Sequence, residues 1–341
     1  MKRTLIYHIK ENPEHKTAEQ YLREKGYSKA VMTHLKKSPT GLSVGGERIY
    51  TTYVLKPGDT LTVALEETDA SPHIVPTPMN LDILYEDQDL MVINKAADLP
   101  IHPSQGNFDN TLANGVAFYF QEKGEAFTYR AINRLDRDTT GLLILAKHML
   151  SGALLSSMVS KRQIKRTYLA AVLGKTPEQG TITAPISRVD GSTIERCVDF
   201  DHGEPACTHY KRLAYGEKSD CSLVQLRLET GRTHQIRVHM KHIGHPLPGD
   251  FLYCPDYHLI RRQSLHSFRL EFPHPITGEP MTFQAPLPED MRLIWKDEDL
   301  WDNDFLRPLL QASPSQWDNR LLSSAPSPLC QDCNFDDPAK P

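Results

Sequence analysis

Hydrophobic and polar positions along the first 67 residues alternate with two different periods, which predicts short helices and strands. Apolar positions recur at helical spacing in 29–37, and segment 18–22 has the same character. Thr17 and Ser28 stand directly before these segments and can cap them, because a hydroxyl side chain accepts from the first free backbone N–H groups of a helix. Segment 60–65 alternates as a strand does. We therefore expect a small α/β module over this part of the chain.

A longer series of apolar segments begins after residue 79. Segment 68–79 contains three prolines, which favours an extended linker. The pattern beyond it predicts strands at 81–86, 90–95, 142–146, 167–173, 206–213, 222–229, 267–272 and 280–284. It predicts helices at 149–159, 234–243 and 289–296. Strands mostly in meander order with interspersed helices predict an α+β domain over 80–296, with a mixed, largely antiparallel sheet flanked by helices.

Charge is distributed unevenly. Residues 297–341 contain nine acidic and three basic residues and lose apolar periodicity, which predicts an acidic, flexible C-terminal tail. The remaining chain has 36 Lys and Arg against 34 Asp and Glu, so the net charge of −4 conceals a mildly basic body. Residues 1–65 alone carry a charge of +5. Because a local basic face decides whether a polyanion binds, the total charge does not exclude a nucleic-acid partner.

Composition places the chain among globular proteins, with 39% hydrophobic and 24% charged residues. No apolar run approaches the ~20 residues of a membrane span. The first residues turn polar too soon for a signal peptide. Four cysteines stand singly, which suits a reducing cytosol: Cys197, Cys207, Cys221 and Cys254.

The first segment with candidate chemistry is 131–147, where a charged loop precedes an apolar strand. Asp136 lies there between Arg134 and Arg137. One interpretation is a charged turn entering a buried strand. The other is a carboxylate that neighbouring arginines keep ionised, and therefore nucleophilic.

The second segment is 228–240, where Gly231 ends a strand before a helix that Thr233 can cap. Arg237 and Lys241 share one helical face at four-residue spacing. This helix could present a cation to a carboxylate elsewhere, or it could simply have a solvated basic face.

The third segment is 161–170, where four basic residues lead into a strand that carries Tyr168. Basic residues beside an aromatic ring suit phosphate contact with base stacking. A solvated charged face is the alternative.

Metal chemistry has weaker support. His234, His239, His242 and His245 are close in sequence. His234 and His239 would lie about 140° apart around a helix, so the four do not converge on one metal. The pair Cys330 and Cys333 has no second pair to complete a zinc site. We expect no metal site.

Together and in this order, the three segments resemble the signatures of the RluA-type pseudouridine synthases. Residues 133–143 resemble the family's His-Arg-Leu-Asp-x-x-Thr-Ser-Gly-Leu-Leu, with Asn133 for His and Thr140 for Ser. Residues 165–170 resemble its Lys/Arg-x-Tyr-x-Ala strand, and 231–239 match its Gly-Arg-Thr-His-Gln-Ile-Arg-Val-His without a gap. Residues 1–67 resemble, more loosely, a small RNA-binding module found in these enzymes and in a small-subunit ribosomal protein.

The resemblance implies isomerisation of specific uridines to pseudouridine in structured RNA, on a base flipped out of the helix. Enzymes with these motifs serve both ribosomal and transfer RNA, and the N-terminal module favours ribosomal RNA here. It implies three catalytic residues: Asp136 as the carboxylate, Arg237, which holds it ionised, and Tyr168, which packs against the base and can assist proton removal. The substrate-binding residues that it implies are Arg134, Arg232, His234, Gln235, Lys165 and Arg166. No metal, redox or nucleotide cofactor is expected, and we expect a cytoplasmic monomer. The alternative is a non-catalytic RNA-binding or ribosome-assembly factor, which would need only the N-terminal module and the basic body.

Overall fold

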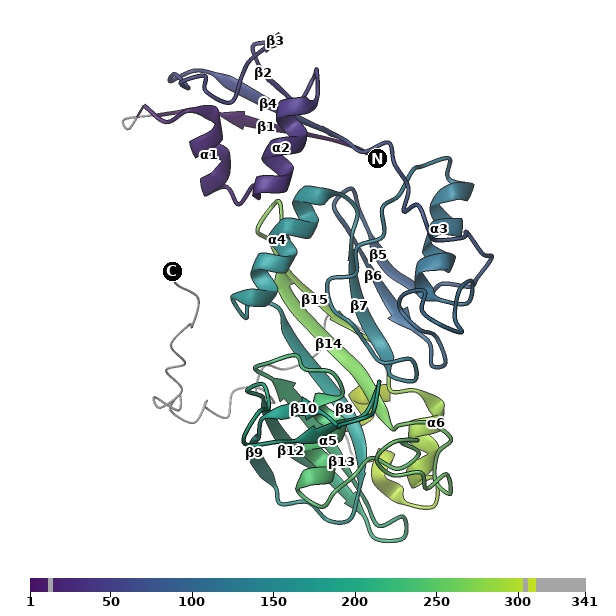
Figure 1. Cartoon of the computed structure of the whole chain (residues 1–341). Coiled ribbons are helices and arrows are strands. Elements are labelled where there is room, and N and C mark those ends of the chain that lie inside the picture. Colours follow the sequence, from purple (N-terminus) through teal and green to yellow (C-terminus); the bar gives the residue numbers. More distant parts are fainter. Residues whose placement is uncertain (12–14, 303–305, 311–341) are drawn as a thin grey trace.

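The computed structural model of the chain describes residues 1–11, 15–302 and 306–310 (Figure 1). An N-terminal module lies against one end of a larger domain built on a mixed sheet. The predicted α+β fold with a mixed, largely antiparallel sheet is confirmed. The pair Cys330 and Cys333 and most of the predicted tail lie outside the described residues.

The N-terminal module is a four-stranded antiparallel sheet, ordered β1-β4-β2-β3, with two helices packed on it. Its elements are β1 (Lys2–His8), α1 (Ala18–Glu24), α2 (Lys29–Lys37), β2 (Leu42–Val44), β3 (Glu47–Arg48) and β4 (Thr60–Glu66). The expected caps are present, since Thr17 forms a capping box with Gln20 and Ser28 accepts from Val31 N. Strand β1 was not predicted, so the module begins with a strand rather than a helix.

Within the described residues, the larger domain contains a nine-stranded sheet. Its strands are, in spatial order, β5 (Ile83–Glu86), β6 (Leu90–Lys95), β7 (Thr140–Ala146), β14 (Leu265–Pro273), β8 (Lys165–Leu173), β13 (Cys221–Leu228), β12 (Cys207–Gly216) and β9 (Gln179–Thr183), with β15 (Pro280–Gln284) paired to β14. The pair β7–β14 is parallel and the others are antiparallel. A separate hairpin joins β10 (Ile186–Arg188) to β11 (Arg196–Val198).

Helices cover both faces of this sheet. They are α3 (Leu112–Glu122), α4 (Met149–Ser160), α5 (Gln235–His242) and α6 (Glu289–Arg292), followed by the 3-10 helices η1 (Leu293–Trp295), η2 (Asp299–Asp302) and η3 (Arg307–Leu310). Helices α3 and α5 pack on one face, and α4 and α6 pack on the other. Because alternate strand residues face opposite sides, Tyr168 of β8 lies on the α5 face and Leu169 on the α6 face.

The predicted boundary at residue 296 is too early. Leu306 and Leu309 are buried against Trp295, and Glu298 accepts from Ser219 Oγ at 2.7 Å. The described part of the expected flexible tail is therefore packed on the larger domain, where apolar side chains stabilise it.

The segment 68–79 has no helix or strand and contains a turn, in which Ile74 N donates to Ser71 O, and it is attached to the larger domain. Ser71 N donates to Phe127 O at 3.3 Å, and Thr77 N donates to Asn114 O at 3.2 Å. The linker thus lies along the larger domain beside α3.

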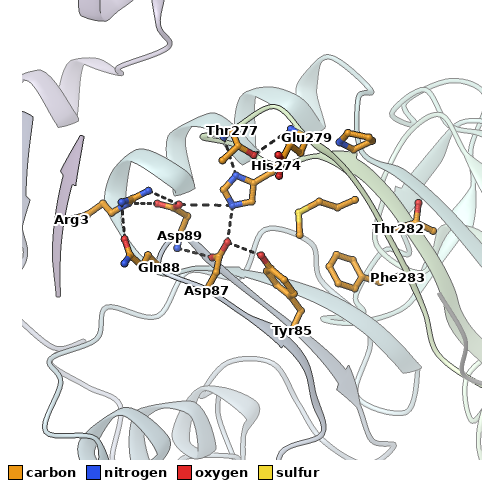
Figure 2. Close-up of a pocket in the computed structure, with 12 residues that line it drawn as sticks. Arg3, Tyr85, Asp87, Gln88, Asp89, His274, Thr277, Glu279, Thr282 and Phe283 are labelled. Atoms are coloured by element: carbon orange, nitrogen blue, oxygen red, sulfur yellow. Dashed lines mark hydrogen bonds and ion pairs between the residues drawn. The ribbon is translucent and has the colours of Figure 1, made fainter. Parts of the chain in front are cut away.

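The module and the larger domain share buried contacts. Leu150 of α4 belongs to the module's apolar core. Arg3 of β1 donates to both oxygens of Asp89, at 2.7 and 3.0 Å, and Asp89 also bonds His148 Nε2 at 2.8 Å. Figure 2 shows Arg3 and Asp89 at the edge of a pocket of about 490 Å³, where His274 bonds Asp87.

Helices of the described chain are all too short or too polar to cross a lipid bilayer.

Candidate active site

The loop between Asn133 and Thr139 carries Asp136 and is fixed from several sides. Asn133 is buried, and its Oδ1 accepts from Ile144 N at 2.9 Å. Lys95 of β6 donates to Arg137 O at 2.7 Å and also bonds the carbonyls of Ala96 and Leu99. Burial lowers the pKa of Lys95 to about 7, against the opposing charges of nearby aspartates. The loop is therefore anchored beneath Asp136 rather than free.

Asp136 and Arg237 form the expected ion pair. Arg237 Nη1 donates to Asp136 Oδ2 at 2.9 Å across 101 residues of sequence. The Arg237 side chain is 1% exposed, whereas that of Asp136 is 28% exposed. The carboxylate is thus accessible from outside and the guanidinium is not.

Arg237 has a second carboxylate partner in Asp250. Its Nε donates to Asp250 Oδ2 at 2.6 Å and its Nη2 to Oδ1 at 2.7 Å. Burial works against the charge, but the hydrogen bonds of Asp250 and the charges of Asp136 and Asp250 raise the pKa of Arg237 above its usual value. The rings of Phe251 and Tyr253 lie over the guanidinium, with their centroids 5.6 and 5.0 Å from Cζ.

His234 lies at the N-terminus of α5 and faces Asp136. Its Nε2 is 4.0 Å from Asp136 Oδ1, and its Nδ1 is 2.9 Å from the Tyr253 hydroxyl. Burial lowers the pKa of His234, which favours a neutral ring near pH 7. The N-cap position is His234, with a left-handed backbone (φ 57°), so the prediction of Thr233 as the cap was wrong.

Strand β8 supplies an aromatic ring and a cation from the same face. Tyr168 is buried, and burial raises the pKa of its hydroxyl, while the charge of Arg166 opposes this. Arg166 shares the face of Tyr168 because the two are separated by one residue. Lys165 is exposed on the opposite face of β8 and does not join the group.

The remaining expected residues have different surroundings. Arg134 is exposed, immediately before the buried Leu135. Arg232 is exposed and pairs with Glu204. Gln235 is 2% exposed and bonds Thr230 Oγ1, Arg232 N, Cys207 O and Thr208 Oγ1, so it braces the turn before α5.

The histidines weighed as metal ligands have other partners. His239 bonds Thr208 Oγ1 and Ala184 O at 2.9 and 2.8 Å, and His245 bonds Leu173 O. Within the described chain, two other groups bring metal-type donors together: Cys207, His209 and Glu229, and Asp87, Asp89 and His274. In the first, His209 and Arg162 already donate to Glu229, and in the second Arg3 donates to Asp89. Their carboxylates therefore have protein cations as partners, and neither group includes Asp136.

Sequence reasoning assigned no role to Asp250, Tyr253 or Lys95. Asp250 and Tyr253 follow α5 in an irregular segment, where no periodicity indicates burial. The signals that could have found Asp250 and Lys95 are the short stretches Gly249-Asp250 and Ile93-Asn94-Lys95, which also resemble sequences of this family.

The arrangement suits chemistry at a carbon–nitrogen bond. One carboxylate is paired with a buried guanidinium and is partly exposed, with an imidazole and an aromatic ring nearby. Such a carboxylate can attack, or stabilise, an electron-deficient carbon.

Comparison with known proteins agrees with this chemistry. A family model described as RNA pseudouridylate synthase matches residues 89–242. An "Uncharacterized RNA pseudouridine synthase YjbO" of Bacillus subtilis (strain 168) is 43% identical over 283 residues, 83% of this chain and 99% of that protein. "Ribosomal large subunit pseudouridine synthase D" of Escherichia coli O6:H1 is 38% identical over 239 residues, 66% of this chain and 72% of that protein.

Solved structures show the same similarity. The structure of "Human RNA Pseudouridylate Synthase Domain Containing 1" superposes with a TM-score of 0.51 at 28% identity, covering 61% of this chain and 83% of that chain.

Proposed function

This chain belongs to the RNA pseudouridylate synthase family, and we propose that Asp136 is the carboxylate on which its isomerisation of uridine in RNA depends. In this reaction the bond between uracil N1 and ribose C1′ breaks, the base rotates, and C5 bonds to C1′. N1 gains a proton and C5 loses one, so the product is an isomer of the substrate. The enzyme must therefore stabilise a ribose that has lost its base while both remain bound.

The observation that carries the proposal is the orientation of Asp136. Arg237 Nη1 binds its Oδ2, while Oδ1 is on the side of His234. Oδ1 is the oxygen that we assign to the reacting nucleotide. The buried cation keeps the carboxylate in place while its charge acts on the substrate.

Tyr168 is proposed to pack against the flipped uracil. Its ring is on the α5 face beside Asp136, where an aromatic surface can replace the stacking that the base loses. The raised pKa keeps its hydroxyl protonated near neutral pH. This supports packing or hydrogen-bond donation rather than proton removal from C5.

RNA contact is proposed for the basic residues around this site and on the module. Arg134 is exposed two residues from Asp136 and would occupy the space that the flipped nucleotide leaves. Arg232 and Arg166 would contact the backbone beside it. The N-terminal module, whose residues 1–65 carry a charge of +5, would hold a more distant part of the RNA.

Ribosomal RNA is the proposed substrate class, and the cytoplasm the proposed location. The supporting observation is the similarity to proteins named ribosomal large subunit pseudouridine synthase D. Mapping pseudouridine across total RNA from cells with and without this protein tests it. Loss of a modification in transfer RNA, with ribosomal RNA unchanged, would contradict the proposed class.

Asp136→Asn tests the catalytic proposal. Tritium release from carbon-5-labelled uridine in RNA should fall at least about 100-fold, because the amide has no charge to stabilise the ribose, while RNA affinity stays within about threefold. Asp98→Asn is the matched control, since Asp98 also pairs with an arginine of this loop, Arg137, at 3.3 Å but is 82% exposed. Turnover of Asp136→Asn above about one hundredth of the unmodified protein would refute the assignment.

A further inference from the structure

Asp250 is a fully buried carboxylate whose position is fixed by its own turn. Its Oδ1 accepts from Leu252 N at 3.0 Å and from Tyr253 N at 3.2 Å. The same carboxylate accepts from Nε and Nη2 of Arg237. Two backbone N–H groups thus fix the Asp250 carboxylate, and this carboxylate binds the Nε–Nη2 edge of the Arg237 guanidinium.

An arginine with a single carboxylate partner tends to bind it through two parallel hydrogen bonds. If Arg237 bound Asp136 in that way, both oxygens of Asp136 would be engaged. In the structure the Nε–Nη2 edge is occupied by Asp250, and Asp136 receives one hydrogen bond, from Nη1 to Oδ2.

We propose that Asp250 is a positioning residue that occupies the Nε–Nη2 edge of Arg237 and fixes the orientation of the guanidinium, so that Arg237 holds Asp136 by Oδ2 alone and leaves Oδ1 for the substrate. The inference rests on the proposed role of Asp136. Phe251 and Tyr253, from the same turn, lie over the guanidinium and resist its rotation out of this plane. One cation between two carboxylates also leaves the group with a net negative charge, which suits stabilisation of a cationic ribose.

Asp250→Asn tests the proposal. Its amide retains one acceptor oxygen, so the two-bond contact is lost and Arg237 can turn its edge toward Asp136. The single-turnover rate of tritium release should fall at least about 30-fold, with RNA affinity within about threefold. Asp89→Asn is the matched control, because the buried Asp89 makes the same two-bond contact with Nε and Nη2 of an arginine, Arg3, at 2.7 and 3.0 Å, away from the Asp136 loop. Its rate should stay within about threefold of the unmodified protein.

A double substitution separates positioning from a general structural role. In Arg237→Lys a single ammonium nitrogen replaces the guanidinium, so the side chain cannot make the two-bond contact with Asp250. This variant is therefore slow even with Asp250 intact. Adding Asp250→Asn to it should cost less than about threefold more. A further loss of about 30-fold in that background would show that Asp250 acts by another route, and would overturn the proposal.

Asp250→Glu serves if Asp250→Asn does not fold. It retains the charge and both acceptor oxygens, so a folded Asp250→Glu should keep at least about one tenth of the rate. A folded Asp250→Glu with no measurable rate would overturn the proposal. Asp136→Asn is measured alongside. If Asp136→Asn is inactive while Asp250→Asn is as fast as the unmodified protein, this inference fails alone, whereas an active Asp136→Asn refutes the proposed function.

Discussion

Asn133 connects the loop that carries Asp136 to β7 as a backbone peptide would. Its Oδ1 accepts from Ile144 N at 2.9 Å, and its Nδ2 donates to Leu142 O at 3.3 Å. A primary amide offers both a donor and an acceptor, as a peptide group does. The residue that departs from the family's usual histidine therefore satisfies two buried backbone groups three residues before Asp136.

His266 is expected to make the protein acid-sensitive. Burial lowers the pKa of His266 to about 4, and its Nδ1 is 2.8 Å from Thr140 Oγ1. In the unfolded chain the pKa is near 6.5, so between about pH 6.5 and about pH 4 the unfolded state binds a proton that the folded state does not. The free energy of unfolding should thus fall as the pH drops through this window, by up to about 3 kcal/mol.

Urea unfolding of His266→Gln from about pH 7 to about pH 4.5 checks this prediction. The variant starts from a lower stability, but its free energy of unfolding should depend less on pH. His8→Gln, at an exposed position, should keep the original dependence. An unchanged slope in His266→Gln would show that other groups cause the acid sensitivity.

The pairing of Asp136 with Arg237 could be predicted because each lies in a distinctive motif. Asp250 could not, because an aspartate in an irregular segment is ordinarily solvent-exposed. The cap of α5 was misplaced by one residue because His234 adopts a left-handed backbone that no side-chain rule indicates. The family resemblance predicted the pair of Asp136 and Arg237, whereas the third partner, Asp250, depended on a tertiary contact.

Strands β7 and β14 form the parallel pair of the large sheet. Both were predictable from apolar runs, but their parallel pairing joins segments far apart in the sequence. Gly141 lies at this contact with φ +104°, and a Cβ there would be 2.2 Å from Ser267 O. The glycine is therefore required by the close approach of two backbones.

Gly141→Ala is expected to lower the free energy of unfolding by at least about 2 kcal/mol, since the methyl group meets backbone and the dihedral angle is unfavourable. Gly191→Ala is the control, because Gly191 also has a positive φ, +75°, but open space around it. It should cost about 1 kcal/mol. Equal losses in denaturant unfolding would mean that backbone conformation, rather than the contact with β14, determines the effect.

Helix α3 and strand β1 were not predicted, for different reasons. Helix α3 is buried in most of its residues and contains Gly115, so it has no polar stripe to reveal a helical period. Strand β1 lies at one edge of its sheet and has only Leu5 buried, so its apolar alternation is weak. A helical or strand period is visible in the sequence only where one face of the element is buried and the other faces solvent.

The N-terminal module and the larger domain are joined by a shared interface and not by the linker alone. Leu150 and Leu154 of α4 contact the module's core. Arg130 pairs with Glu67, and Asp89 pairs with Arg3. Composition and charge indicated the two parts, but not that they would share buried side chains.

A chain that lacks residues 1–79 should therefore be less stable than the full chain. Exposing Leu150 and Leu154 should cost about 2 kcal/mol or more, which lowers the thermal midpoint by about 5 °C. Replacing both leucines with glutamine in the shortened chain should reduce its aggregation. An unchanged midpoint on removal of the module would show that the shared contacts contribute nothing to stability.

The sheet order has a consequence for the protein during its synthesis on the ribosome. Asp136 is beside β7, and Tyr168 and Arg237 belong to the half of the domain that begins with β8. The strand that joins the two halves is β14, which comes late in the sequence. A nascent chain that has emerged only as far as α5 already contains all three residues but lacks the strand between their halves. This nascent chain should bind RNA through the module before it can modify that RNA. The site should assemble only when β14 enters the sheet.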